Sequence, residues 1–390
     1  MQVSAALIVR NESAFIEDCL KSLTGVVDEI VVVDTGSTDD TVEIARRFPI
    51  KLHSFQWRQD FSAARNYAID QASGDWILYI DADERIEVPD RAVWRDIVAD
   101  KGKAGWKLRF YQRVGWTPYM ELRLFRNDPR IRFHGVIHER MQDGVDAVCR
   151  DDGLEIASCS VSLHHFGYES GQHHKISRNV PLLRKYLAED PSRVYCWWHL
   201  GQMLLSAGNE VEAAAAWTSG IAAARRHGAN GDVSNAMPFF SLALLEAAQN
   251  EPVGDLLEEA VALFPDHLAL RWLAAKHAIE QGKGETARKE LEDLAAIDPD
   301  NFVDPRVCYN KTLFSHKVPE SLALCHFRAG RFREAAEWYR RAAGSAPDPR
   351  ACEVRAQLAD AKAAAAAALD RSSCSASQPA ARHKSAAAPK

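Results

Sequence analysis

The chain has 390 residues, of which 47% are hydrophobic and 26% are charged, and its formal net charge is −6. This length predicts two or three domains, and the composition excludes disorder of the whole chain. A net negative charge disfavours general electrostatic binding to nucleic acid or to anionic lipid.

Neither a membrane span nor a secretory signal is predicted. The longest uncharged stretch, residues 194–209, contains a histidine, a glutamine and two glycines, which suit a bilayer poorly. The first twelve residues lack the basic segment that opens a signal peptide. Eight cysteines are present without a C-x-x-C pair, which is typical of free thiols in a reducing compartment. We therefore expect a cytoplasmic protein without disulfides or a zinc knuckle.

Strand and helix patterns alternate over the first 80 residues. Apolar, valine-rich runs predict strands at residues 3–9, 29–33, 52–55 and 76–80. Helical spacing and capping residues predict helices at residues 15–23, 37–47 and 60–72. This alternation predicts an open, mainly parallel sheet with helices on both faces. In such a sheet a ligand binds beyond the carboxyl ends of the strands.

Acidic side chains follow three of these four predicted strands. They are Glu12 after the first strand, Asp34 after the second, and Asp81 and Asp83 after the fourth. Carboxylates gathered at one edge of a sheet predict a site for a cation or for a ligand rich in hydroxyl groups.

Asp81 and Asp83 form a D-x-D motif. Residues two apart in an extended chain point to the same side, so both carboxylates can face the ligand edge. Two oxygen ligands beside a diphosphate suit Mg²⁺ or Mn²⁺. The alternative is a turn or a helix cap. A turn is the interpretation that we give to the second D-x-D, Asp298 and Asp300, which lies at a repeat boundary.

Arg65 falls within the apolar stripe of its predicted helix, on the same face as Phe61 and Ala64. A guanidinium in that position requires an anionic partner. Two interpretations stay open at this point. The partner is a bound nucleotide, or it is an acidic side chain, Asp81 or Asp34, in a structural ion pair.

Residues 107–165 have a less regular, strand-like pattern. Strands are predicted at residues 107–111, 121–125, 131–133 and 161–165. Two pairs of adjacent candidate residues lie at the ends of such strands: His138 with Glu139, and His164 with His165. Adjacent strand residues point to opposite faces. Only one residue of each pair can therefore face the ligand edge, and the local sequence does not decide which.

Helices are predicted from about residue 175 onward. Residues 197–217, 282–299 and 330–347 fit the tetratricopeptide pattern of spaced bulky residues, Gly, Ala and Pro, and a weaker copy ends at Pro265. Small residues in this pattern let paired helices pack closely, and proline ends the second helix. The last 20 residues contain no acid and no aromatic residue. We expect a final helix at 349–370 and a disordered tail at 371–390.

Four segments near the N-terminus together resemble the family 2 glycosyltransferases of the GT-A fold. They are V-R-N-E (9–12), D-T-G-S-T-D-D-T (34–41), W-R-Q-D-F-S-A-A-R-N (57–66) and G-D-W-I-L-Y-I-D-A-D-E (74–84). The later segments F-R (125–126), F-H-G-V-I-H-E (133–139), H-F-G-Y (165–168) and R-N (178–179), with the helical repeats, resemble a bacterial branch that joins both kinds of domain. That branch includes the peptide S-glycosyltransferases of glycocin biosynthesis.

The resemblance implies an α/β GT-A domain, Rossmann-like with a mainly parallel sheet, at residues 1–172. An all-α tetratricopeptide-like domain is implied at residues 173–348. The implied substrate is a nucleotide sugar, commonly UDP-linked. Donor contacts are implied for Asn11, Glu12, Asp34, Arg65, Asn66 and Asp81.

The resemblance also implies a divalent cation, Mn²⁺ or Mg²⁺, bound by Asp83 and His165. Glu139 stands where such enzymes place their general base. The chemistry of the residues agrees, because a cation can neutralise the leaving diphosphate and one carboxylate can deprotonate the acceptor. These features predict an inverting hexosyltransferase.

Helical repeats favour a protein or peptide acceptor, and they leave open an oligomer formed through the repeat domain. The alternatives are a glycan or lipopolysaccharide acceptor, a nucleotidyltransferase, and a tetratricopeptide scaffold without catalysis. A nucleotidyltransferase is disfavoured because the loop 10–13 has no glycine to hold a triphosphate and the chain has no P-loop motif.

Overall fold

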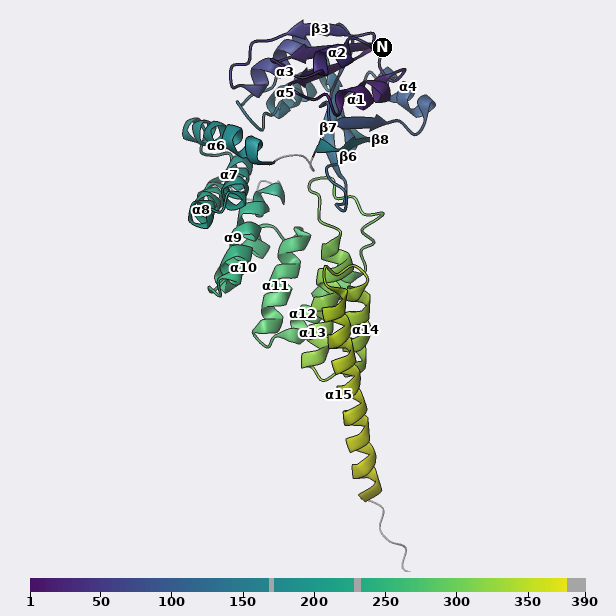
Figure 1. The fold of residues 1–390 in the computed structure, drawn as a ribbon, viewed down its shortest axis with the longest axis vertical. Helices are drawn as coiled ribbons and strands as arrows, with labels where there is room; N and C mark the ends of the chain where they lie inside the picture. Colours follow the sequence, from purple (N-terminus) through teal and green to yellow (C-terminus); the bar gives the residue numbers. More distant parts are fainter. Residues whose placement is uncertain (168–171, 228–232, 377–390) are drawn as a thin grey trace, which may run out of the picture. The chain divides into compact units, whose positions relative to one another are not determined.

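A computed structural model of the chain describes residues 1–167, 172–227 and 233–376 (Figure 1). By its internal contacts the chain divides into two compact units. The first unit consists of Met1–Arg271 with Asp300–Lys311, and the second of Trp272–Pro299 with Thr312–Lys390. Over the described residues the first unit contains the sheet and a series of helices, and the second unit is helical.

One mixed sheet forms the centre of the first unit. Its described strands are β1 (Val3–Val9), β2 (Glu29–Asp34), β3 (Lys51–Ser54), β4 (Trp76–Tyr79), β5 (Glu84–Glu87), β6 (Lys103–Tyr111), β7 (Tyr119–Arg126) and β8 (Glu155–His165). They lie in the order β3-β2-β1-β4-β7-β6-β8-β5. As predicted, β1 to β4 pair in parallel. Beyond them β7 runs antiparallel to both β4 and β6, so the complete sheet is mixed.

Helices cover both faces of β1, which explains its unbroken apolar sequence. Leu7 belongs to a core shared with α1 (Ile16–Leu23) and α4 (Arg91–Ala99). Its neighbour Ala6 belongs to a second core shared with α3 (Phe61–Asp70) and α5 (Gln142–Asp152). Because successive strand residues point to opposite faces, this one strand contributes to two cores. Another short helix, α2 (Thr41–Ala45), follows β2 and begins later than the sequence predicts.

Residues 131–133 form a loop rather than the predicted strand. Ile131 and Phe133 are buried in the core under α3 and α5, so their apolar character reflects packing. The backbone of Phe133 is held by a side chain instead of a neighbouring strand. Asn66 Nδ2 donates to the Phe133 carbonyl at 2.9 Å, and Asn66 Oδ1 accepts from the Phe133 N–H at 2.8 Å.

The remaining described helices follow one another along the chain. They are α6 (Gln172–Glu189), α7 (Val194–Ser206), α8 (Glu210–His227), η2 (Val233–Ala236), α9 (Met237–Ala248), α10 (Gly254–Leu263), α11 (Leu268–Glu280), α12 (Gly284–Ala295), η3 (Leu313–Lys317), α13 (Val318–Arg328), α14 (Phe332–Ala343) and α15 (Pro349–Ala376). Neighbours pack as pairs, among them α7 with α8 and α13 with α14. No helix in the described ranges is long and apolar enough to cross a membrane.

The glycines and alanines of the repeat pattern lie at equivalent positions in three helix pairs. A glycine with left-handed backbone follows the first helix of each pair, and a buried alanine comes five residues after it. These are Gly208 with Ala213, Gly282 with Ala287, and Gly330 with Ala335. Positive φ favours glycine at these turns, and the small alanine allows the two helices to approach.

The C-terminal helix is longer than predicted. α15 continues six residues beyond residue 370, to Ala376, so the start of the expected tail is helical. The consecutive alanines 363–368 have high helix propensity, and a helix once formed propagates into the following residues because each one adds a backbone hydrogen bond. Residues 377–390 of the expected tail, and Tyr168 of the H-F-G-Y segment, lie outside the described residues.

Candidate active site

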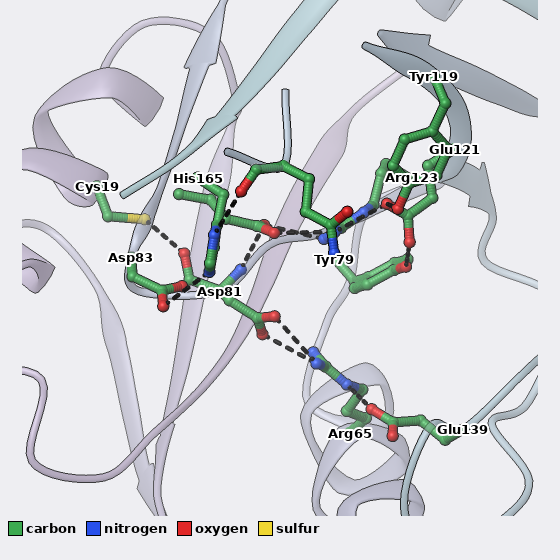
Figure 2. A network of polar contacts seen from close by, with 12 residues as sticks. Cys19, Arg65, Tyr79, Asp81, Asp83, Tyr119, Glu121, Arg123, Glu139 and His165 are labelled. Carbon is green, nitrogen blue, oxygen red and sulfur yellow. Dashed lines mark hydrogen bonds and ion pairs between the residues drawn. The ribbon is translucent and has the colours of Figure 1, made fainter. Parts of the chain in front are cut away.

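The acidic residues predicted from the strand ends lie together at the carboxyl edge of the parallel strands. Figure 2 shows Asp81 between two further pairs of side chains. Asp83 and His165 form one pair, and Arg65 and Glu139 form the other. The site therefore has two sides, which the D-x-D segment after β4 joins.

His165 and Asp83 are in direct hydrogen-bonding contact. His165 Nε2 lies 3.1 Å from Asp83 Oδ2, and His165 Nδ1 lies 3.1 Å from the Gln112 carbonyl oxygen. Since a carbonyl only accepts, Nδ1 donates to it and Nε2 is directed at Asp83. Burial lowers the pKa of His165, but the hydrogen bond and charge of Asp83 outweigh it, so the net pKa is raised.

The structure separates the two adjacent histidines as strand alternation requires. His164 points away from the D-x-D segment, with its Nε2 3.0 Å from Glu87 Oε2. Its ring stacks on Tyr111 at a centroid distance of 4.5 Å. His165, rather than His164, is thus the histidine that meets Asp83.

Asp83 and His165 fit a divalent cation that is shared with a substrate. Adjacent ligands on an octahedral cation with bonds of about 2.1 Å lie about 3 Å apart, which is close to the 3.1 Å between Asp83 Oδ2 and His165 Nε2. Over the described residues no group of three or more His, Cys, Asp or Glu side chains is arranged to hold a metal. Two protein ligands leave coordination positions for phosphate oxygens and water, and an imidazole ligand favours Mn²⁺ over Mg²⁺.

Arg65 bridges the other two carboxylates of the site. Its Nη2 donates to Asp81 Oδ1 at 2.9 Å, and its Nε donates to Glu139 Oε1. The side chains of Arg65 and Glu139 are only 12% and 10% exposed. Burial opposes the charge on Arg65, but Asp81 and Glu139 raise its pKa. The ion pair with Asp81 is one of the two partners that the sequence left open, and Glu139 is a second partner that it did not indicate.

The loops that follow β1 and β2 are tied to each other. Asn11 has left-handed backbone, with φ of 57°, and its Oδ1 accepts from the Thr38 N–H at 2.7 Å. The backbone N–H of Glu12 donates to the hydroxyl of Thr41, the first residue of α2, at 2.7 Å. Asp34 Oδ1 accepts from the Ser37 N–H at 3.0 Å. These contacts hold the three residues implied for nucleotide binding in one preformed edge.

Asn66 has a different environment from the other implied donor contacts. Both polar groups of its amide are engaged by the backbone of Phe133. Direct contact with a donor would require this pair to open. In the structure Asn66 positions the loop that leads to Glu139.

A buried ion-pair network lies behind the D-x-D segment, and the sequence did not single it out. Arg123 on β7 binds Glu84 through two hydrogen bonds of 2.8 and 2.9 Å. Glu84 Oε2 also accepts from the Asp81 N–H at 2.9 Å. The Arg123 guanidinium lies 4.4 Å from the centroid of the Tyr79 ring and donates to Glu121 at 3.2 Å. This network fixes the backbone of Asp81.

Burial raises the pKa of Glu84 to about 7, and the charge of Arg123 opposes that shift. The sequence of β7 contains a signal for this network, because alternate residues of a strand point to the same face. Glu121 and Arg123 are two apart in an apolar strand and therefore point to one face. Buried charges two apart indicate a paired network rather than a solvated face.

Gly167 allows the backbone after β8 to approach Asp83 closely. A Cβ added at residue 167 would lie 1.9 Å from Asp83 Oδ2, far inside contact distance. Phe166 N–H also donates to the Asp83 carbonyl at 2.8 Å. The glycine of the H-F-G segment thus leaves space for the carboxylate that is implied as a metal ligand.

A cavity of about 770 Å³ adjoins Glu139. One wall comes from the sheet domain and includes Tyr119, Met120 and Glu121. Another wall comes from the helical part of the same unit and includes Tyr195 and Trp198 of α7. Residues 305–308 contribute a third wall. A volume of this size accommodates a ligand of several rotatable groups.

His138, the neighbour of Glu139, points into the helices rather than toward Arg65. Its ring stacks on His199 of α7 at a centroid distance of 4.1 Å and meets the edge of Tyr195. Burial, together with the charge of Arg193, lowers the pKa of His138 to about 4. The pair His138–Glu139 is therefore divided between the helical wall and the D-x-D side.

Comparison with known families agrees with this arrangement. Residues 4–90 match the sequence model of "Glycosyl transferase family 2", and residues 229–307 and 320–349 match models of the "Tetratricopeptide repeat". The first match contains β1 to β4, the D-x-D segment and Arg65.

Two relatives show the extent of the similarity. A TPR repeat-containing protein of Synechococcus elongatus is 37% identical over 226 residues, which cover 55% of each chain. The SPbeta prophage-derived glycosyltransferase SunS of Bacillus subtilis is 28% identical over 218 residues, or 52% of this chain and 49% of SunS. The chain thus spans about half the length of the curated relatives that it matches.

Among solved structures, glucosyl-3-phosphoglycerate synthase of Mycobacterium tuberculosis aligns with 48% of this chain and 79% of its own chain, at 18% identity and a TM-score of 0.35. The sheet topology and the family match together define the N-terminal domain. The chain therefore has an N-terminal glycosyl transferase family 2 domain with a GT-A-like mixed sheet, which tetratricopeptide repeats follow.

Proposed function

We propose that the protein is a metal-dependent, inverting hexosyltransferase that moves a sugar from a UDP-linked donor to a side chain of a protein or peptide. One observation carries the proposal: Asp81 lies between the Asp83–His165 pair and the Arg65–Glu139 pair at the carboxyl edge of the sheet. The pair proposed to bind the diphosphate through a cation, Asp83 and His165, thus lies in the same site as Glu139, the carboxylate proposed to accept a proton.

The donor half of the site consists of residues that follow β1, β2 and β4, with His165 at the end of β8. Asn11, Glu12 and Asp34 lie in the tied loops that would receive the base and ribose, and Asp81 follows β4, which pairs with β1. A divalent cation bound by Asp83 and His165 would neutralise charge on the leaving diphosphate. Asp83 is held for this role by the close approach of Gly167, and His165 by the Gln112 carbonyl.

The acceptor half of the site centres on Glu139. In a single displacement the acceptor oxygen or sulfur forms a bond to the anomeric carbon as the bond from that carbon to the diphosphate oxygen breaks. The proton of the acceptor goes to the Glu139 carboxylate, and the anomeric centre inverts. Arg65 fixes the orientation of the Glu139 carboxylate through the hydrogen bond from its Nε.

The helical walls of the cavity support a polypeptide acceptor. Tyr195 and Trp198 on α7 and the segment 305–308 line the same cavity as Glu139. Helical repeats present surfaces that bind extended peptides, and aromatic side chains contribute most of the energy at such surfaces. Unpaired thiols on the seven cysteines whose side chains are described support the predicted cytoplasmic location.

The test is release of UDP and transfer to protein, measured with the purified full-length chain and a panel of UDP-sugars. Asp83→Asn should abolish transfer and remove the response of donor binding to Mn²⁺, because an amide is a poor ligand for a hard cation. Asp300→Asn, in the other D-x-D, serves as the matched control and should cause no comparable loss of transfer or of the response to Mn²⁺. Equal rates for wild type and Asp83→Asn in both EDTA and Mn²⁺ would exclude the metal from the mechanism.

A further inference from the structure

The cavity beside Glu139 is lined by more cationic than anionic side chains. The cationic ones are Lys107, Arg113, Arg140, Arg193 and Arg306. The anionic ones are Glu121 and Glu139. This excess contrasts with the net charge of −6 of the whole chain, so the positive lining is a local property of the cavity.

Both acids of the lining are already engaged by internal partners. Glu139 is paired with Arg65. Glu121 accepts hydrogen bonds from Tyr79 at 3.2 Å, from Tyr119 at 3.1 Å and from Arg123 at 3.2 Å. Neither Arg65 nor Arg123 is part of the lining. The two negative charges are therefore compensated from behind. Among the cations, Arg140 is paired with Asp143 and Arg306 with Asp304. The positive charge available to a ligand is therefore supplied by Lys107 and Arg193.

Lys107 and Arg193 are half-buried, and neither is paired with a carboxylate among the residues that the structure describes. Arg193 donates to the Tyr186 hydroxyl at 3.1 Å and to the His138 carbonyl at 3.2 Å. For the Lys107 ammonium the structure gives no hydrogen bond or ion pair within the described residues. A partly desolvated cation without a counter-charge gains more from an anionic ligand than an exposed one does.

The apolar part of the lining suits a flexible peptide chain. Met120, Met141 and Met237 are three of the five methionines of the whole sequence. Methionine adapts its shape to different side chains and is common at surfaces that bind varied peptides. Trp116 and Trp198 add rigid aromatic contacts.

From this lining we infer that the acceptor is an acidic polypeptide segment, with Asp or Glu within a few residues of the side chain that receives the sugar. The inference rests on the proposed function and specifies its substrate. The acidic groups would bind Lys107 and Arg193, the neighbouring apolar side chains would contact the methionines and tryptophans, and the accepting side chain would reach Glu139.

The test uses three synthetic peptides of eleven residues with a central Ser, and three with a central Cys. Within each set the flanking positions carry Asp, Asn or Lys, and the rest of the sequence is identical. Binding to the full-length chain is measured by fluorescence anisotropy without donor. We expect the Asp peptides to bind about tenfold or more tightly than the Asn peptides, to lose that advantage at high salt, and to be the preferred acceptors with UDP-sugar.

Lys107→Gln and Lys103→Gln form a matched pair of variants on strand β6. Lys107 lines the cavity, whereas Lys103 is paired with Glu155 at 2.7 Å outside it. Lys107→Gln should reduce the preference for Asp over Asn by at least about threefold, and Lys103→Gln should retain it. Melting temperatures of both variants confirm that they are folded.

Three results would overturn the inference. They are equal binding of Asp and Asn peptides, equal effects of the two lysine variants, and transfer to an anionic glycan or to vesicles of anionic phospholipid while no peptide is modified. UDP release from the donor by the wild-type chain separates these results from failure of the proposed function. If UDP is released and acidic peptides are not preferred, the glycosyltransferase assignment holds and the acceptor class is wrong.

Discussion

A single guanidinium, that of Arg65, connects the two carboxylates that define the halves of the site. Its Nη2 binds Asp81 and its Nε binds Glu139. Its Cζ atom lies 5.2 Å from the centroid of the Tyr79 ring. Burial raises the pKa of the Asp81 carboxyl, whereas the charge of Arg65 lowers it. The lowering contributions outweigh burial, so the net pKa is below its ordinary value. One shared cation therefore holds both carboxylates in place and favours the ionised form of Asp81.

Arg65→Lys should disturb this arrangement although it retains the charge. One ammonium cannot present two parallel donors in the fixed geometry of a guanidinium. We expect a loss of about 2 kcal/mol in the free energy of unfolding, and the pKa of Asp81 should rise. The acidic limb of the rate profile should then move to higher pH. Arg132→Lys, in a more exposed pair with Asp70, is the control. Unchanged melting temperature and unchanged acidic limb in Arg65→Lys would contradict this role.

Glu139→Gln should lose more than about 10²-fold in rate on a Ser or Thr acceptor, because such a hydroxyl needs a positioned base. On a Cys acceptor, whose ordinary pKa is about 8.5, the loss should shrink as the pH rises from 7 to 9. Donor affinity should be unchanged. Transfer rates against pH and calorimetry of donor binding measure both effects.

His138→Gln is the partner experiment to Glu139→Gln. The His138 ring stacks on His199 and burial lowers its pKa, so we expect a less stable protein whose chemical step is close to wild type. If His138→Gln were inactive and Glu139→Gln active, the base would be the imidazole, and the carboxylate would only orient it.

At the scale of elements, Glu29 at the start of β2 joins three neighbouring segments. Its carboxylate accepts from Ser4 of β1 and from the Ser73 N–H at 2.7 Å, and it pairs with Lys51 of β3. Burial raises the pKa of Glu29, but these partners outweigh it and lower the pKa from 4.5 to about 2. This end of the sheet is opposite the carboxyl edge, so its role is stability.

The lowered pKa gives a pH-dependent contribution to stability. A carboxyl whose folded pKa is below its unfolded pKa stabilises the protein above about pH 4.5, and that stabilisation is lost as the pH falls toward 2. Glu29→Gln should reduce the free energy of unfolding by about 1–2 kcal/mol at neutral pH, after allowance for solvent screening, and should flatten the acid dependence. Glu17→Gln, in an exposed pair with Lys21, should do neither. Denaturant unfolding at pH 7 and pH 3 distinguishes the two variants.

Within the first unit, the segment Asp300–Lys311 is hydrogen-bonded to the loop that connects β6 and β7. The Thr117 N–H donates to the Tyr309 carbonyl at 2.8 Å, and the Tyr309 N–H donates to Thr117 Oγ1 at 2.9 Å. Thr117 is fully buried. The same segment supplies residues 305–308 to the cavity wall, so this attachment shapes the acceptor side.

Thr117→Val should weaken the attachment at nearly constant volume. The substitution leaves the buried Tyr309 N–H without its partner, at a cost of about 1–3 kcal/mol. We expect a lower melting temperature and a higher KM for the acceptor, with little change in UDP release from the donor alone. Thr218→Val, at an exposed threonine of α8, is the control. An unchanged acceptor KM would show that residues 305–308 do not form part of the acceptor site.

Local patterns in the sequence predict those elements whose signals lie within a few residues of one another. Strands β1 to β4 were predicted because each is an apolar run between turn residues, and the D-x-D edge followed from their parallel order. The repeat helices were predicted because glycine and alanine recur at fixed spacing. Family resemblance chose His165 and Glu139 within their pairs and gave them and Asp83 their roles, which stay predictions although the structure brings the three residues to one edge.

The pairing of residues that are distant in the chain depends on the packing of complete elements. Strand alternation showed that one of His164 and His165 faces the ligand edge, but the pairing of β8 with β5 selected His165. The apolar run 131–133 is a loop because the Asn66 side chain takes the backbone groups that a strand would have paired. The bridge from Arg65 to Glu139 and the network of Glu84 with Arg123 join side chains 74 and 39 positions apart. Such long-range pairs depend on the packing of whole elements, which local periodicity does not specify.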